Sequence, residues 1–162
     1  MSLELIAAML AITAALGFYS WGVFGERMHG ALTGKYVVLF WIGLVCDSTG
    51  TLIMTNMAQS SSAAMSGSSI HGLTGLLAIV LMLIHATWAT FTYFHGSEAS
   101  RKRFHTFSTV VWLIWLIPYI IGIMLGMPFL HLKMICIVGT SLAVVAILAF
   151  VLLRPKKMHA HA

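Results

Sequence analysis

The sequence predicts an all-α fold: a polytopic membrane helical bundle with five transmembrane helices. Of its 162 residues, 60% are hydrophobic and only 8% are charged, whereas soluble domains carry about 25% charged residues. Apolar runs of about 20 residues recur, which is the length that crosses the hydrocarbon core of a bilayer as a helix. The connections between the runs are short, so we expect one bundle over residues 1–153 and a polar cytoplasmic tail over 154–162.

The apolar runs give the expected helices in order. The first run opens without basic residues and is longer than the apolar part of a secretory signal, so we interpret it as a retained helix. The link between the second and third runs is uncharged and rich in serine, as a short external loop can be. The predicted spans are 3–24, 36–57, 70–94, 107–125 and 132–153.

The basic residues predict the orientation of the bundle. Eight of the nine Lys and Arg residues fall on one side of the predicted membrane, and Lys133 alone falls on the other. Because short cytoplasmic loops carry an excess of Lys and Arg, the N-terminus is predicted outside and the C-terminus in the cytoplasm. The same bias accounts for the net charge of +5, and no solvated basic surface is left to indicate nucleic-acid binding.

Two histidines bracket most of the third span. His71 and His85 are fourteen residues apart, which at 100° per residue is within roughly 40° of whole turns, so both imidazoles lie on one face. Between them that face carries Gly75, Ala78 and Met82, a stripe of small or adaptable side chains. Haem iron takes imidazole as an axial ligand, so the stripe predicts a haem site. The alternative is that the histidines only hydrogen-bond to neighbouring helices.

Asp47 is the charged residue that lies well inside a predicted span, where a carboxylate is costly and often functional. Counted from the helix ends, Asp47 and His85 are both about 15 Å deep. We therefore expect a hydrogen bond from Asp47 to His85 that would orient the ring, as carboxylates do for many ligating histidines. The alternative is that Asp47 bonds to Thr51 or Ser48 in a proton-relay or structural role.

The remaining haem ligands are predicted from depth. His131, at the start of the fifth span, matches His71 in depth, and Met54 lies near the same level. His105 lies at the cytoplasmic mouth of the fourth span, nearer the surface than His85, so a second axial ligand for His85 is not obvious. One or two molecules of haem b per chain are therefore expected.

Hydrolytic chemistry has no support in the sequence, which offers no nucleophile–base arrangement, phosphate loop or HExxH helix. Whether the chain is an enzyme is left open. If it is one, we expect a haem-dependent oxidoreductase.

Three runs resemble the HsmA family, small bacterial membrane proteins associated with haem sensing and tolerance. They are FWIGLVCDSTGT (40–51), HGLTGLLAIVLMLIHATWAT (71–90) and FHTFSTVVWLIWLIPYIIGIMLGM (104–127), and the similarity covers about residues 18–127. The resemblance implies a multi-pass protein of the bacterial cytoplasmic membrane that meets haem in the bilayer. It carries over His71, His85, His105 and Asp47 as the positions that match the family pattern.

Three functions remain open at this level. The first is a haem-binding membrane protein that sequesters, senses or relays haem. The second is a b-type cytochrome or reductase module for electron transfer, and the third is a proton- or cation-coupled carrier that uses Asp47 and His85. A homodimer formed through glycine-bearing helix faces, and a structural role in a larger complex, are further alternatives.

Overall fold

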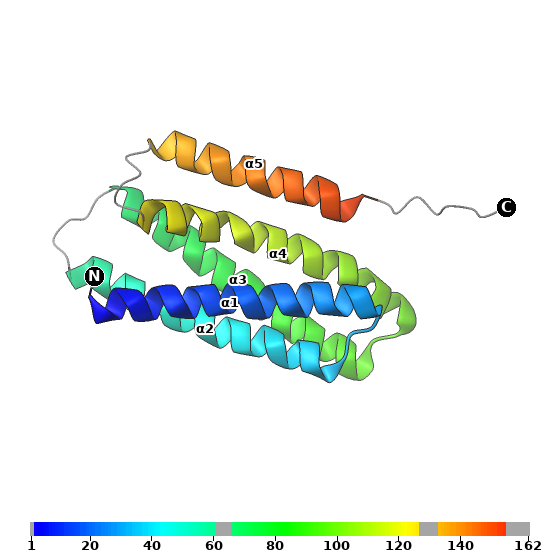
Figure 1. The fold of residues 1–162 in the computed structure, drawn as a ribbon. Coiled ribbons are helices and arrows are strands. Elements are labelled where there is room, and N and C mark those ends of the chain that lie inside the picture. Colours follow the sequence, from blue (N-terminus) through cyan, green and yellow to red (C-terminus); the bar gives the residue numbers. More distant parts are fainter. Residues whose placement is uncertain (1, 61–65, 127–132, 155–162) are drawn as a thin grey trace.

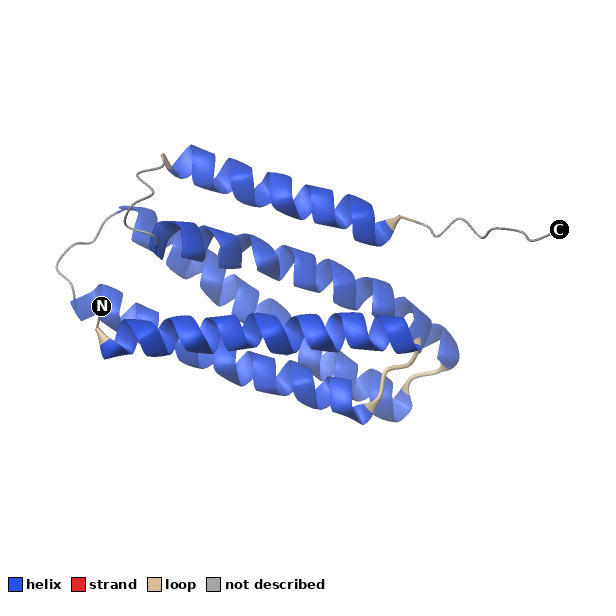
Figure 2. Cartoon of the chain, viewed as in Figure 1, coloured by secondary structure: helices blue, strands red, loops and turns tan. Residues whose placement is uncertain are grey.

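The fold was described from a computed structural model, which describes residues 2–60, 66–126 and 133–154. For residues 58, 60, 66–71 and 126 only the helical backbone is described. The described chain contains five helices, as the apolar runs predict (Figure 2). The helices are α1 (Leu3–His29), α2 (Gly34–Ser60), α3 (Ser66–His95), α4 (Glu98–Gly126) and α5 (Met134–Leu153).

Helices α1 to α4 form a closed four-helix bundle, because α1 packs on α2, α2 on α3, α3 on α4, and α4 on α1. Successive helices run antiparallel, and α5 lies outside the bundle and packs principally against α4 (Figure 1). The interior holds large aromatic and apolar side chains, while many leucine, isoleucine and phenylalanine side chains face outward. All five helices are long and apolar enough to cross a membrane. The predicted fold class is therefore confirmed.

Six of the seven described Lys and Arg residues gather at one end of the bundle, which we call the basic end. It is formed by the α1–α2 and α3–α4 turns and the end of α5. Lys133, at the start of α5, lies at the opposite end. The basic residues at the basic end are Arg27, Lys35, Arg101, Lys102, Arg103 and Arg154.

Four of the helices are longer than the predicted apolar spans. The α1 helix begins where the Ser2 hydroxyl accepts a hydrogen bond from the Leu5 N–H (3.3 Å) and ends at Gly30, whose φ of 65° suits glycine. It thus continues five residues beyond the predicted end at Phe24. The α4 helix likewise begins at Glu98, within the basic turn, and not at Phe107. Both extensions carry polar residues into the bundle.

Glycines let α1 and α2 approach closely. The Phe40 ring of α2 lies against Gly22 of α1, and the Tyr19 ring of α1 lies against Gly43 of α2. A Cβ at Gly43 would be 2.6 Å from the Tyr19 ring, which is too close for any real contact. Gly50, seven residues after Gly43 on α2, lies against Ile12, seven residues before Tyr19 on α1. The glycines of α2 therefore serve helix packing, as small residues do at membrane helix interfaces.

Candidate functional site

The predicted stripe on α3 faces the interior of the bundle. Ala78, Met82, His85, Ala89 and Thr92 are all buried. These residues recur every three or four positions, so they lie on one side of the helix. The prediction that His85 points inward is therefore confirmed. Toward the start of α3, a Cβ added at Gly75 would meet nothing within 4 Å, so the close packing ends there.

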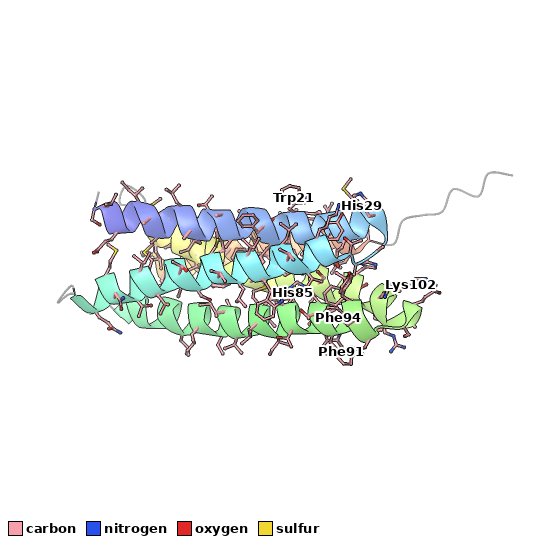
Figure 3. The ribbon with its side chains drawn as sticks, turned by 90° about the horizontal axis from the view of Figure 1, so that it is seen from below. Trp21, His29, His85, Phe91, Phe94 and Lys102 are labelled. Atoms are coloured by element: carbon pink, nitrogen blue, oxygen red, sulfur yellow. The ribbon has the colours of Figure 1, made fainter. Side chains whose placement is uncertain are left out.

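His85 is fully enclosed by protein. Its Nε2 lies 3.0 Å from the Ser108 hydroxyl of α4, in hydrogen-bond contact. Its ring stacks on Phe104 with 5.4 Å between centroids and 3° between planes, and the Phe40 ring meets it edge-on at 4.4 Å. The other nitrogen, Nδ1, has no hydrogen-bond partner in the part of the chain that the structure describes. Figure 3 shows His85 between the helices, while Trp21 and Phe91 point outward.

Asp47 does not bond to His85, so the predicted pair is wrong. Trp115 of α4 donates its Nε1–H to Asp47 Oδ2 (2.8 Å), and the Tyr19 ring packs edge-on against Trp115 at 5.0 Å. Asp47 lies thirteen residues from the start of α2, which is about 20 Å, whereas His85 lies ten residues or about 15 Å from the end of α3. The longer helices remove the match in depth on which the prediction depended.

The other residues predicted beside Asp47 do not form a site with it. Thr51 and Met54, one and two turns farther along α2, are half-buried. The Thr51 carbonyl accepts a hydrogen bond from the Thr55 hydroxyl (2.8 Å), an ordinary contact within the helix.

A second buried carboxyl group, Glu26 of α1, lies near His85. Its side chain has 0% of its surface exposed, and neither carboxyl oxygen has a hydrogen-bond partner among the described residues. His105 Nδ1 of α4 is 3.8 Å from Glu26 Oε1. The Ser108 hydroxyl also lies beside the Glu26 carboxyl group, without a hydrogen bond of standard geometry. Glu26, His105, Ser108 and His85 thus form one group, which we call the acid–imidazole cluster.

The sequence interpretation missed Glu26 because it ended the first span at Phe24, ahead of the charged residues. A signal was present in the spacing. Ala15, Tyr19, Gly22 and Glu26 recur at intervals of four, three and four, which places Glu26 on the buried face of α1. His105 was predicted as a haem ligand at the mouth of the fourth span, and instead it faces this carboxyl group with 18% of its side chain exposed.

The packing around His85 does not fit haem. A ligating imidazole needs a free nitrogen, which Nδ1 offers, and a gap that admits a porphyrin beside it. The rings of Phe40, Phe104 and Phe107 lie 4.4 to 6.0 Å from the imidazole centroid and fill that space. The predicted ligands His71, by its side chain, and His131 lie outside the described residues. Within the described part of the chain, no three His, Cys, Asp or Glu side chains are placed to hold a metal ion.

The fold and the cluster together define a helical multi-pass membrane protein with ionisable groups buried in its bundle. No protein-family model matches the chain, and neither a curated protein nor a solved structure is significantly similar to it. The resemblance to the HsmA family therefore stays a prediction.

Proposed function

We propose that this membrane protein binds and transfers protons at the acid–imidazole cluster, as the protonation site of a proton-coupled carrier. The sequence predicted a proton- or cation-coupled carrier as one alternative, and we assign its protonation site to a different set of residues. Glu26 and His105 take the place of Asp47, and the Ser108 hydroxyl, which contacts His85, links them to the buried imidazole. We further propose that the basic end faces the cytoplasm of a bacterium, on the basis of the basic bias and the family resemblance.

The observation that carries the proposal is the carboxyl group of Glu26, which is buried and, within the described chain, accepts no hydrogen bond of standard geometry. A purely structural carboxyl group in a protein interior is normally satisfied by donors, because an unsatisfied one costs several kcal/mol. Ionisable residues kept inside membrane bundles mark proton relays and ion pathways in many transporters and pumps. Glu26 has the burial and the imidazole neighbour that such a role requires.

The geometry gives the proton an entry and an inner acceptor. His105 is partly exposed at the basic end, so water can exchange a proton with its ring. A proton passed from the imidazolium of His105 to the carboxylate of Glu26 leaves a neutral imidazole and a neutral acid. The net charge of the pair is zero before and after this step, and the buried carboxyl group is left neutral.

Ser108 extends the path to His85. A hydroxyl can accept a proton from one side while it donates its own to the other, and the Ser108 Oγ contacts the inner imidazole at 3.0 Å. His85 can take a proton on one ring nitrogen and release one from the other, and its Nδ1 is unoccupied by any partner. The inner end of the relay is therefore the imidazole of His85.

Infrared difference spectroscopy of the purified full-length protein tests the proposal. A pH titration should show a carboxylic acid C=O band that disappears as pH rises, and Glu26→Gln should abolish this band. Glu4→Gln is the matched control, because Glu4 is exposed in the first turn of α1, and it should leave the band unchanged. The band must also shift in His105→Gln, since His105 is the nearest proton partner.

Reconstitution into vesicles tests whether the site supports transfer. With a pH-sensitive dye inside and a membrane potential imposed, wild type and Glu4→Gln should acidify the lumen, and Glu26→Gln should not. Equal acidification by wild type and Glu26→Gln, with an unchanged infrared band, would contradict the proposal and leave Glu26 as a packing residue.

Haem binding is the second candidate, and the inward stripe of α3 is what favours it. The enclosed imidazole of His85 offers haem no room. Haem b held by His71 and His131 remains a proposal, to be checked by reduced-minus-oxidised spectra of protein purified from haem-replete cells.

A further inference from the structure

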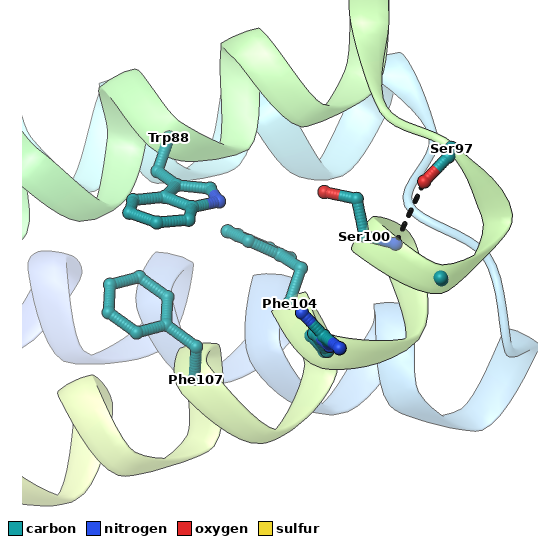
Figure 4. A pocket seen from close by; sticks show the side chains of 7 residues that line it. Trp88, Ser97, Ser100, Phe104 and Phe107 are labelled. Atoms are coloured by element: carbon teal, nitrogen blue, oxygen red, sulfur yellow. Dashed lines mark hydrogen bonds between the residues drawn. The ribbon is translucent and has the colours of Figure 1, made fainter.

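A pocket of about 280 Å³ opens between the end of α3 and the beginning of α4, at the basic end of the bundle. One side is aromatic and the other is polar and basic. Figure 4 shows Trp88 of α3 opposite Phe104 and Phe107 of α4, with the two serines beside them. The lining side chains include Trp88, Ser97, Ser100, Arg103, Phe104 and Phe107.

The polar side of the pocket suits an anion. Arg103 forms no hydrogen bond or ion pair with another side chain of the described chain, so its guanidinium is free to bind a ligand. The Ser97 hydroxyl oxygen accepts the Ser100 N–H (3.3 Å), which leaves its own O–H available as a donor. A guanidinium flanked by hydroxyl donors is the donor set that binds phosphate groups through charge-assisted hydrogen bonds.

The surrounding charge is also positive. Arg101 and Lys102 directly precede Arg103, and Glu98 is the one acidic residue between positions 97 and 103. Arg101 reaches the Tyr93 carbonyl (3.4 Å), which holds this turn of basic residues against the end of α3. An anion that enters the pocket therefore meets an excess of positive charge.

The aromatic side places the ligand at the membrane surface. Trp88 lies seven residues, or about 10 Å, from the end of α3, and tryptophan is enriched at this level of membrane proteins. Trp88 and Phe107 rings lie 5.3 Å apart, and Ile84 and Phe91, one turn to either side of Trp88, are exposed on the lipid-facing surface. An acyl chain could follow this apolar surface away from the pocket.

We propose that the pocket binds the phosphate headgroup of an anionic phospholipid, with its acyl chains along the outer face of α3. The volume suits a headgroup, since pockets that enclose whole drug-sized ligands start at about 300 Å³. Basic pockets between transmembrane helices are known to bind such headgroups. The site is distinct from the acid–imidazole cluster and does not depend on the proton-transfer proposal, although Phe104 and Phe107 contact both the pocket and the His85 ring.

Native mass spectrometry of the full chain released from nanodiscs tests this proposal. The nanodiscs contain phosphatidylcholine with a minor fraction of phosphatidylglycerol, and the fraction of protein that retains each lipid is measured. Wild type should retain phosphatidylglycerol in preference to phosphatidylcholine. Arg103→Gln should weaken that retention at least about tenfold, which corresponds to one hydrogen bond to a charged group.

Lys102→Gln is the matched control, because it removes the same charge from the same turn but outside the pocket. It should weaken retention no more than about fivefold, the effect of one basic residue near an anionic surface. Equal retention of the two lipids, or equal losses in Arg103→Gln and Lys102→Gln, would overturn the proposal. Displacement of phosphatidylglycerol by millimolar inorganic phosphate alone would also overturn it, since it would identify a site for small anions.

Discussion

Replacement of Glu26 by leucine should make the protein more stable, although the substitution removes a buried residue. The structure supplies the reason, because both carboxyl oxygens of Glu26 are buried and accept no hydrogen bond of standard geometry from the described residues. Each unsatisfied buried polar group costs about 1–3 kcal/mol, and leucine has a similar volume without that cost. Replacement of a whole buried ion pair by apolar residues is often neutral or stabilising by about 1–4 kcal/mol. We expect a gain in the free energy of unfolding within this range for Glu26→Leu.

The substitution does not leave His105 with a buried, unpaired charge. Its ring is partly exposed, so it can stay neutral and hydrated when the carboxyl group is gone. For a chain of this length, 1 kcal/mol corresponds to about 2–4 °C in melting temperature. Thermal unfolding followed by circular dichroism in one detergent measures the difference. Glu4→Leu, at an exposed position, should change the free energy of unfolding by no more than about 0.5 kcal/mol.

A loss of stability in Glu26→Leu would refute the reasoning. Removal of one partner from a strong buried ion pair costs about 3–5 kcal/mol. A loss of that size would mean that Glu26 and His105 form a stabilising ion pair, and that the carboxyl group is retained for the fold. A gain in stability together with the loss of luminal acidification in the same variant would mean that the carboxyl group is retained for function.

Three further predictions concern packing, the central hydrogen bond and haem. Gly22→Ala should destabilise the protein by about 1–3 kcal/mol through overpacking against a ring. Gly75→Ala, which faces open space, should be neutral or stabilising by up to about 1 kcal/mol, and thermal unfolding compares the two. Trp115→Phe should cost about 1–3 kcal/mol by removing the N–H that Asp47 accepts. Asp47→Leu added to that variant should recover most of the loss, and an additive result in the double-mutant cycle would contradict the bond. His85→Ala should leave any haem spectrum of the purified protein unchanged, and an α band that vanishes in this variant would show that the imidazole reaches haem.

The fold could be predicted from the sequence because membrane spans depend on a single repeated property. Runs of apolar residues long enough to cross the bilayer gave each helix, and the spacing of Ala78, Met82 and Ala89 gave the buried side of α3. These are local features, so no knowledge of the neighbouring helices was needed. Helix ends were less well predicted, because α1 and α4 continue into polar sequence that apolar length alone excludes.

The site was predicted only in part because side-chain partners depend on how helices are rotated and shifted against one another. Depth counting brought Asp47 to the level of His85, but it could not show that Trp115 would reach the carboxylate first. Glu26 was overlooked because the first span was ended at the first charged residues, without regard to the spacing of the buried positions on the helix. A search for small and aromatic residues at helical spacing on α1 would have included it.

The exchange of rings and glycines between α1 and α2 has a consequence for how the chain is built. The three residues back along α1 from Gly22 to Tyr19 match the three residues forward along α2 from Phe40 to Gly43. A shift of one helix along its axis by a single residue would press a ring onto the backbone of the other. The α1–α2 hairpin therefore packs in one axial register. During synthesis this hairpin can therefore lock its alignment before the later helices emerge, and it then serves as the template against which α3 and α4 take their places.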